Sequence, residues 1–176
     1  MEMRFCPVCG TRLRLREQPH EAPALYCESC VAYRFPLFST AVAVVLLDAC
    51  GENMLLIRQY GEPESVLVAG YVDKGETAED AVRREVREEL GMSAGRLSFI
   101  RSRYYAPSET LMLLYEATAA EESAAPNWEV DGWEWVPVGR ARELVKPGGL
   151  AESFLSDYEK HLQKIKNHLI QNEQGG

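Results

Sequence analysis

The chain has 176 residues, of which 46% are hydrophobic and 26% charged, and its formal net charge is −8. This length allows one medium domain, with or without a small appendage, and excludes a third large domain. The acidic balance argues against broad nucleic-acid binding, which needs a basic surface to displace counterions from phosphates. No apolar run of about 18 residues could span a membrane, and the N-terminus lacks the pattern of a signal peptide. A cytoplasmic protein is therefore expected.

The first 36 residues contain four of the five cysteines and no apolar period that could build a core alone. Cys6 with Cys9, and Cys27 with Cys30, form two C-x2-C pairs separated by seventeen residues. Two such pairs supply four thiolates and predict a structural zinc site that holds a small ribbon, residues 1–36. A redox C-x-x-C and an iron–sulfur cluster are weaker alternatives, because their contexts and spacings differ. Nucleic-acid contact by the ribbon ranks below a scaffold or dimer role.

Residues 37–176 alternate strand-like and helical patterns and are expected to form the second domain. Strands are expected at 39–48, 54–60, 65–70, 96–105, 110–118 and 133–138. A helix is expected at 77–91, with Thr77 as N-cap and Gly91 as C-cap. One or two helical turns at 139–145 precede an amphipathic helix at 149–170, which is expected to pack on the sheet or on a second subunit. This order predicts an α/β sandwich with a mixed sheet.

The helix at 77–91 crowds three carboxylates, Glu85, Glu88 and Glu89, into one turn. At about 100° per residue they occupy a sector roughly 100° wide beside small apolar residues, and the helix's arginines fall mostly on the opposite or flanking side. A solvated face with salt bridges would interleave the signs instead. Carboxylates clustered at a partly buried surface favour a hard divalent cation, Mg²⁺ or Mn²⁺. Glu76, just before the helix, is expected to brace Arg84.

Residues 70–92 resemble the Nudix box, G-x5-E-x7-R-E-U-x-E-E-x-G-U with U aliphatic. All nine specified positions match: Gly70, Glu76, Arg84, Glu85, Val86, Glu88, Glu89, Gly91 and Met92. The resemblance implies the Nudix α/β/α sandwich and Mg²⁺- or Mn²⁺-dependent hydrolysis of a nucleoside diphosphate linked to another group.

The resemblance also implies a role for each of these side chains. Glu85 and Glu89 would be metal ligands, with Glu88 as a further ligand or as the base that activates water. Arg84, paired with Glu76, would orient the site. The remaining metal ligands implied by the resemblance are the backbone carbonyl of Ala69 and the carboxylate of Glu129.

A four-cysteine ribbon directly before a Nudix domain is similar to the NADH pyrophosphatase subfamily. The chain departs from that subfamily's S-Q-P-W-P-F-P-x-S segment, because residues 102–110 read SRYYAPSET. The second acid expected after Glu129 is replaced by Gly132, for which Asp131 or Glu134 are candidate substitutes. The expected substrate is a dinucleotide such as NADH or NAD, cleaved to NMN(H) and AMP, and the alternatives are ADP-ribose, a damaged nucleoside triphosphate and NAD-capped RNA. A non-catalytic nucleotide- or RNA-binding regulator is the alternative of another class, and the resemblance implies a homodimer.

Substrate contacts are expected mainly from aromatic positions and from the divergent segment. Tyrosines and phenylalanines there are candidate stacking surfaces for adenine or nicotinamide, although a tyrosine on a strand also serves core packing. The expected substrate-binding residues are Phe35, Tyr71, Arg103, Tyr104, Tyr105, Ser108, Thr110 and Ala151.

Overall fold

The structure, a computed structural model, describes residues 3–174, with the side chains of 169 and 172–174 left out. Contacts divide the chain into two compact units, Met1–Ser39 and Thr40–Gly176, and each is described by itself. Across the described residues, no helix has the length and apolar character needed to cross a membrane.

The N-terminal unit contains a small antiparallel sheet that the sequence pattern does not predict. Its strands are β1 (Arg14–Gln18), β2 (Glu21–Cys27) and β3 (Ala32–Arg34), in that order across the sheet. The buried cluster of this unit consists of Cys6, Leu13 and Cys27. Among the residues of these strands only Tyr26 and Cys27 are buried, so the sheet has almost no buried apolar face from which it could be recognised.

The C-terminal unit is built on a mixed six-stranded sheet, as expected. Its strands are ordered β7-β8-β4-β5-β9, and β6 pairs with β4 beside this path. Their bounds are β4 (Ser39–Leu47), β5 (Asn53–Gln59), β6 (Val68–Tyr71), β7 (Ala94–Tyr105), β8 (Thr110–Ala119) and β9 (Val130–Pro137). Two strands start three residues away from the predicted position, and the other bounds lie within two residues of the prediction. β6 starts at Val68 and not at residue 65, and β9 starts at Val130 and not at residue 133.

The helices are α1 (Ala78–Leu90) and α2 (Leu150–Gln174), with short 3-10 turns η1 (Ala106–Ser108) and η2 (Val138–Glu143). The Thr77 side chain caps α1 by accepting a hydrogen bond from the Asp80 amide, and Gly91 ends it with a φ of 65°. Both capping residues are therefore confirmed. α2 runs beyond residue 170, where the prediction ends it.

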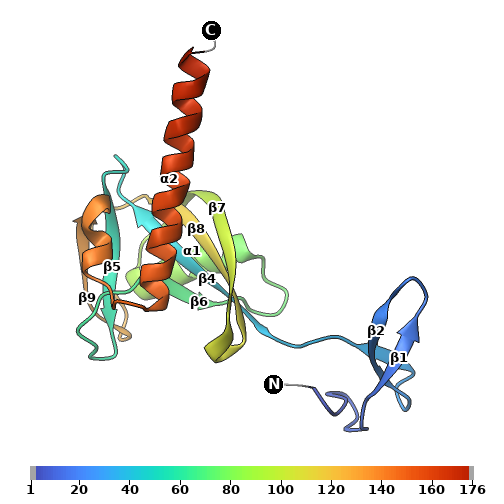
Figure 1. Cartoon of the computed structure of the whole chain (residues 1–176). Helices are drawn as coiled ribbons and strands as arrows, with labels where there is room; N and C mark the ends of the chain where they lie inside the picture. The colour runs from blue at the N-terminus through green and yellow to red at the C-terminus, as the bar shows by residue number, and fades with distance from the viewer. Residues whose placement is uncertain (1–2, 175–176) are drawn as a thin grey trace. The chain divides into compact units, whose positions relative to one another are not determined.

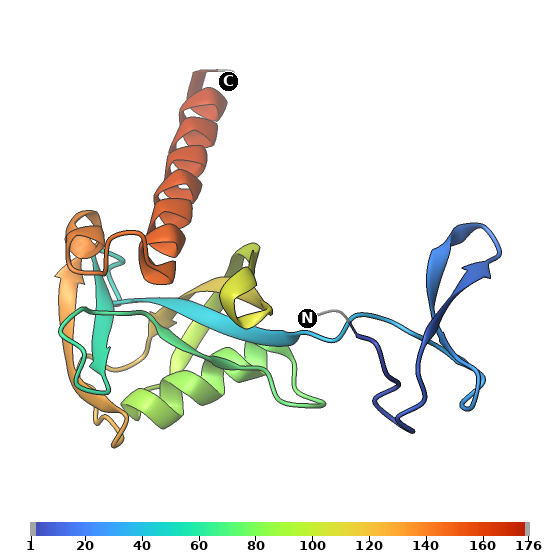
Figure 2. The same ribbon diagram turned by 60° about the horizontal axis from the view of Figure 1, so that its bottom comes forward.

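The two helices cover opposite faces of the sheet, which confirms the α/β/α sandwich (Figures 1 and 2). β4 alternates between the two layers. Ala43 and Val45 face the core that Phe154 of α2 completes. The alternate residues Val42, Val44 and Leu46 face the core that contains the apolar stripe of α1. Strands buried on both faces are near-continuous in apolar residues, which is the pattern of this stretch of sequence.

Polar contacts add to the docking of α2 on the sheet. The Asp157 carboxylate, with a side chain only 2% exposed, accepts hydrogen bonds from Arg101 Nη1 at 3.1 Å and Arg103 Nη2 at 2.5 Å, both on β7. The Tyr158 hydroxyl donates to Glu116 on β8 at 2.8 Å. These contacts lie in the first half of α2, and Ile165 in the second half is 44% exposed.

Candidate metal and active site

Close packing between β6 and α1 places the Glu85 carboxylate against the strand. A methyl group added at Gly70 would overlap the Glu85 side chain, so the absence of a side chain at this glycine admits the carboxylate. The side chain of Glu85 is only 12% exposed. Gly70 and Glu85, two positions of the Nudix-like pattern, therefore meet directly in the structure.

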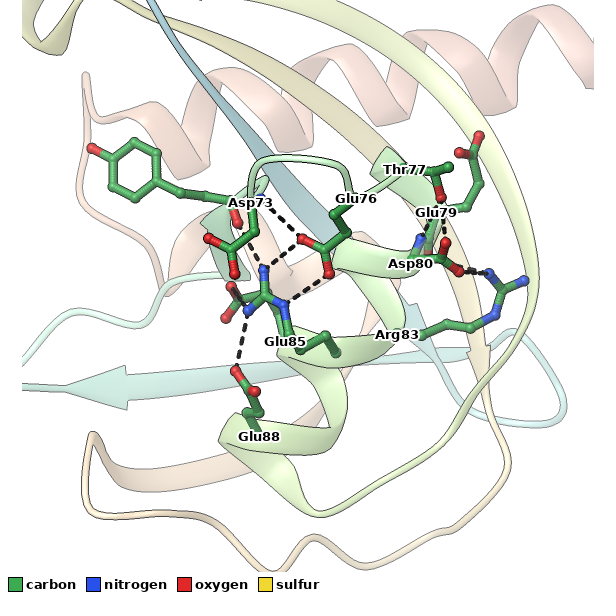
Figure 3. Close-up of polar contacts among 10 residues, drawn as sticks. Asp73, Glu76, Thr77, Glu79, Asp80, Arg83, Glu85 and Glu88 are labelled. Carbon is green, nitrogen blue, oxygen red and sulfur yellow. Dashed lines mark hydrogen bonds and ion pairs between the residues drawn. The ribbon is translucent and has the colours of Figure 1, made fainter.

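The Arg84 guanidinium gathers the carboxylates around it. Its Nε and Nη2 donate to the two oxygens of Glu76 at 2.9 and 3.0 Å, so the expected contact with Glu76 is present. Its Nη1 donates to Glu85 at 2.6 Å and to Glu88 at 3.1 Å. A fifth bond reaches the Tyr71 carbonyl at 2.8 Å, so all five N–H groups are used. Figure 3 shows Glu76, Glu85 and Glu88 converging on this one group.

This arrangement corrects the helical-wheel placement of Arg84 away from the acids. Its side chain is 26% exposed and lies among the carboxylates. A long, flexible side chain can reach a neighbouring face of its helix, and three carboxylates supply the attraction. They raise the pKa of Arg84 further above its usual range, with the hydrogen bond to Glu76 as the largest cause.

Glu89 is the most deeply buried acid of the cluster, with 4% of its surface exposed. Burial raises its pKa to about 7, and the charges of Glu85, Glu129 and Glu88 act in the same direction. Burial also raises the pKa of Glu85, with smaller contributions from Glu88 and Glu129. The structure thus brings Glu129 close enough to interact electrostatically with the acids of α1.

These residues fit a divalent cation. Oε2 of Glu89 is buried and has no hydrogen-bond partner, which is costly for a carboxylate that lacks a positive group. A hard cation bound by oxygen ligands would satisfy it. In the described residues the glutamate oxygens do not converge to the close spacing seen among the cysteine sulfurs, so the assignment of individual glutamates as ligands stays a prediction.

Two residues near the acids were not predicted from the sequence. Gln59, the last residue of β5, donates from Nε2 to Glu89 Oε1 at 3.0 Å. The next residue, Tyr60, is 67% exposed; partial desolvation and the charges of Glu129, Glu89 and Glu85 raise the pKa of its hydroxyl. The polar end of an otherwise apolar strand was the only available signal, and many surface strands share that feature.

A cavity of about 230 Å³ lies beside this cluster, on the α2 side of the sheet. Its lining includes Gln59 and the predicted residues Ala69 and Ala151, together with Ala43, Val66, Leu67, Met112, Leu150 and Phe154. Two segments far apart in sequence, the start of β6 with the residues just before it and the start of α2, therefore contribute to one apolar cavity. A second cavity of about 360 Å³, lined by Cys50 and Trp135 among others, shares no residue with it.

The other predicted substrate-binding residues lie in varied surroundings. Tyr71 and Tyr104 are 59% and 55% exposed, whereas Tyr105 packs against the core on the α2 side. Phe35 is 61% exposed and belongs to the N-terminal unit.

Three polar residues of the divergent segment are engaged within the protein. Arg103 pairs with Asp157 of α2. The Ser108 and Thr110 hydroxyls lie 2.8 Å apart. Thr110 is 1% exposed, so its side chain offers almost no surface to a ligand. Roles in substrate binding stay predictions for all of these positions.

The two candidate substitutes for the acid missing at Gly132 have other partners. Asp131 Oδ2 accepts a hydrogen bond from the Gly61 amide at 2.6 Å. Glu134 pairs with Arg58 at 3.5 Å. A Cβ at Gly132 would come within 2.7 Å of Arg58 Nη2, so the arginine lies over this glycine.

The four cysteines of the N-terminal unit form a compact cluster whose sulfurs all lie within 4.8 Å of one another. The Cys9 sulfur lies 3.4 Å from that of Cys27 and 3.3 Å from that of Cys30, and the Cys6 and Cys30 sulfurs are 3.9 Å apart. Thiolates about 2.3 Å from a tetrahedral metal would be roughly 3.8 Å apart. The geometry therefore fits a tetrathiolate metal site, and all five cysteines of the chain are free of disulfides.

Electrostatics around the sulfurs agree with metal binding. Burial opposes ionisation of Cys6, but hydrogen bonds from Arg34 and from the Val8 and Cys9 amides lower its pKa to about 6. The pKa of Cys30 is raised to about 12, first by its hydrogen bond with Cys9 and then by burial. Four thiolates at this spacing repel one another, so their joint ionisation requires a bound cation.

The NUDIX domain family matches residues 37–154 of the chain. The chain belongs to the Nudix family. Similar curated proteins include the NAD-capped RNA hydrolases NudC of Pseudomonas aeruginosa, 30% identical over 158 residues, and of Vibrio atlanticus, 26% identical over 166 residues. These alignments cover 88% and 92% of this Nudix protein but only 55% and 60% of the relatives. The chain thus spans somewhat more than half the length of these relatives.

Solved structures agree on the fold of this Nudix protein. A NUDIX hydrolase from Nitrosomonas europaea has a TM-score of 0.59 at 18% identity, with 92% of each chain covered. The NUDIX domain of Shewanella oneidensis NrtR, solved with ADP ribose, has a TM-score of 0.59 at 15% identity. The match covers 78% of this chain and 94% of the NrtR chain. At these identities the likeness establishes the fold alone.

Proposed function

We propose that this Nudix protein is a divalent-cation-dependent hydrolase that cleaves the pyrophosphate bond of a dinucleotide such as NADH or NAD, giving NMN(H) and AMP. The observation that carries the proposal is Glu89, which is buried beside Glu85 with one carboxylate oxygen unpartnered. A buried, uncompensated acid is unfavourable for a purely structural helix, and it suits a cation site.

Each side chain of the cluster has a proposed task. Mg²⁺ or Mn²⁺ at this site would neutralise the pyrophosphate and lower the pKa of a bound water. Glu85 and Glu89 would hold the cation, aided by Glu129 and the Ala69 carbonyl. Glu88, whose side chain is 57% exposed, can reach solvent and accepts the proton of the attacking water.

Arg84 orients the acids without entering the reaction. Its bidentate pairing with Glu76 fixes the guanidinium on the loop before α1, and its remaining donors hold Glu85 and Glu88 in place. Fixed carboxylates need little reorganisation when charge develops on the phosphoryl oxygens, which is how preorganised sites accelerate reactions.

The four-cysteine cluster is proposed to hold a structural Zn²⁺. With four thiolates around the metal no coordination position is left for water, so zinc would stabilise the N-terminal unit and take no part in hydrolysis. The hydrogen bond from Arg34 Nε to Cys6 Sγ, at 3.2 Å, would offset part of the negative charge of a tetrathiolate.

The choice of substrate rests on the relatives and on charge. The two relatives compared above are named NAD-capped RNA hydrolases, which supports an NAD-type group as the part recognised. The net charge of −8 disfavours extended RNA contacts, so the free dinucleotide is preferred over the capped RNA. ADP-ribose and oxidised nucleoside triphosphates are the remaining substrates to compare.

A hydrolysis panel with Mg²⁺ and Mn²⁺ tests this function. NADH, NAD, ADP-ribose, 8-oxo-dGTP and a short NAD-capped RNA would be incubated with the full chain, and the mononucleotide products separated by chromatography. AMP together with NMN(H) from the free dinucleotides is the expected result, and Glu88→Gln should abolish it. Faster hydrolysis of the triphosphate or of the capped RNA would show that this compound, and not the free dinucleotide, is the preferred substrate. If nothing is hydrolysed and Glu88→Gln binds the nucleotides as well as the parent, the chain is a nucleotide-binding regulator.

A homodimer through α2 is proposed as the assembly. Leu155 and Tyr158 are buried on the sheet, and the apolar stripe continues along α2 at Leu162, which is half-buried, and Ile165, which is exposed; this continuation is available to a second copy. In an antiparallel pair, Glu159 of one copy would flank Lys166 of the other, so the charges are complementary. Ile165→Lys should halve the mass measured by light scattering, with Gln163→Lys as the control, and an unchanged mass would rule out this interface.

A reducing, cytoplasmic compartment suits the free thiols.

A further inference from the structure

We infer that Gln59 is a positioning residue that fixes the Glu89 carboxylate from the wall of the cavity lined by Ala69 and Ala151. The inference rests on the proposed function, because it concerns the same cation site.

The sheet branches near Gln59. β5 pairs with β4 at Met54 and Leu55, whereas the first part of β4 pairs with β6 from Val68 to Tyr71. Beyond Leu55, β5 is joined through Ile57 to Val66 and no longer to β4. A side chain near this branch can reach groups on both faces of the sheet, which a residue inside a regular ladder cannot do because side chains alternate strictly.

The backbone around Gln59 is irregular and anchored. The register between β5 and β9 shifts opposite Gln59, where Asp131 of β9 is the extra residue, and bulges of this kind are common next to functional sites. The following residues, Tyr60 and Gly61, have φ angles of 56° and 74°, and the Gly61 amide is held by Asp131. The end of β5 is therefore fixed in a shape that an ordinary strand end would not adopt.

Gln59 contacts both the acid cluster and the cavity. Its Nε2 donates to Glu89 Oε1 at 3.0 Å, and Gln59 itself lines the cavity that Ala69 and Ala151 share. Among the residues lining that cavity it has the only polar side chain. The Gln59 side chain therefore forms part of the cavity wall and at the same time donates a hydrogen bond to Glu89.

The hydrogen bond selects which oxygen of Glu89 is available. Oε1 is occupied by the amide, and Oε2 is buried without a partner. A carboxylate held through one oxygen presents the other in a fixed direction, and partners of this kind, one step removed from the metal, typically change metal affinity by about 10–100-fold. Gln59 thus acts on the cation through Glu89 and does not need to touch it.

Mn²⁺ binding to the full chain, measured from the loss of the free-ion EPR signal, tests this role. Gln59→Met keeps the length of the side chain and removes the donor, so the dissociation constant for Mn²⁺ should rise by about 10–100-fold. Gln59→Asn retains the amide on a side chain too short to reach Glu89, so the dissociation constant for Mn²⁺ should rise here too; this variant serves if the first one does not fold. Gln163→Met, at an exposed position of α2, is the matched control and should bind like the parent.

Hydrolysis by the same variants gives the second readout. The Mn²⁺ concentration for half-maximal activity should rise by the same factor, and excess Mn²⁺ should restore kcat, which a general structural defect would not allow. Mn²⁺ affinity within twofold of the parent in a folded Gln59 variant would overturn the inference. Weaker Mn²⁺ binding with no hydrolysis of any substrate would refute the proposed function and leave the role of Gln59 intact.

Discussion

Substitution of Glu89 by glutamine should stabilise the cation-free protein at alkaline pH while it removes the cation site. The pKa of Glu89 is about 7 in the folded protein, against an ordinary value of 4.5. At about 1.4 kcal/mol per pKa unit, this difference corresponds to about 3 kcal/mol in the free energy of unfolding.

The sign follows from the raised pKa. Folding favours the protonated form of Glu89, so its contribution to stability is fully present below pH 4.5 and is lost as the pH rises through about 7. Glutamine mimics the protonated acid at every pH. Between pH 4.5 and pH 8.5 the parent should therefore lose about 3 kcal/mol more than Glu89→Gln, because other titrating groups contribute similarly to both proteins.

Urea unfolding followed by tryptophan fluorescence provides the assay. Trp128, Trp133 and Trp135 are the three tryptophans of the chain and lie in the C-terminal unit, so the signal reports that unit. Buffers without Mg²⁺, Mn²⁺ or chelator leave the cysteine cluster undisturbed. Parallel pH profiles for the two proteins would refute the reasoning, as would an equal gain in stability of both upon addition of Mn²⁺ at pH 8.5.

Three further substitutions probe other contacts. Gly70→Ala should lower activity at least 100-fold, since the methyl group displaces the Glu85 carboxylate, and the loss should exceed that of an alanine at Gly139, where nothing lies nearby. Asp157→Asn should reduce the free energy of unfolding by about 1–2 kcal/mol in urea titrations, because it removes the charge that two partly exposed arginines share. Cys27→Ser should abolish zinc binding, measured by a chromophoric chelator, while the tryptophan-monitored transition stays unchanged; a shift of that transition would show that the units depend on each other.

The sequence was sufficient to predict elements whose cause is local. The cap residues of α1 and the apolar run of β4 act over a few neighbouring positions, so pattern and chemistry identify them. The two cysteine pairs are equally local, and their convergence follows from the thiolate count that a tetrahedral metal needs. The Nudix-like pattern could be read in the same way, because its spacing reflects one loop and one helix.

Contacts between distant segments could not be predicted. Gln59 meets Glu89 only because the sheet branches at β4, and the chain carries no marker of that branch. Arg103 pairs with the Asp157 carboxylate of α2, 54 residues away in the sequence, and no local pattern indicates that contact. The sheet of the N-terminal unit was missed because its strands bury little apolar surface, and alternation is the signal by which strands are recognised.

The central position of β4 determines how its amides should exchange with solvent deuterium. Its residues from Val42 to Leu46 have at most 1% of their surface exposed, and they belong alternately to the layer of α1 and to the layer of α2. With β8 on one side and β5 and β6 on the other, release of either helix alone leaves these hydrogen bonds covered. The β4 amides should therefore exchange only through global unfolding of the C-terminal unit, and their protection measures its whole stability.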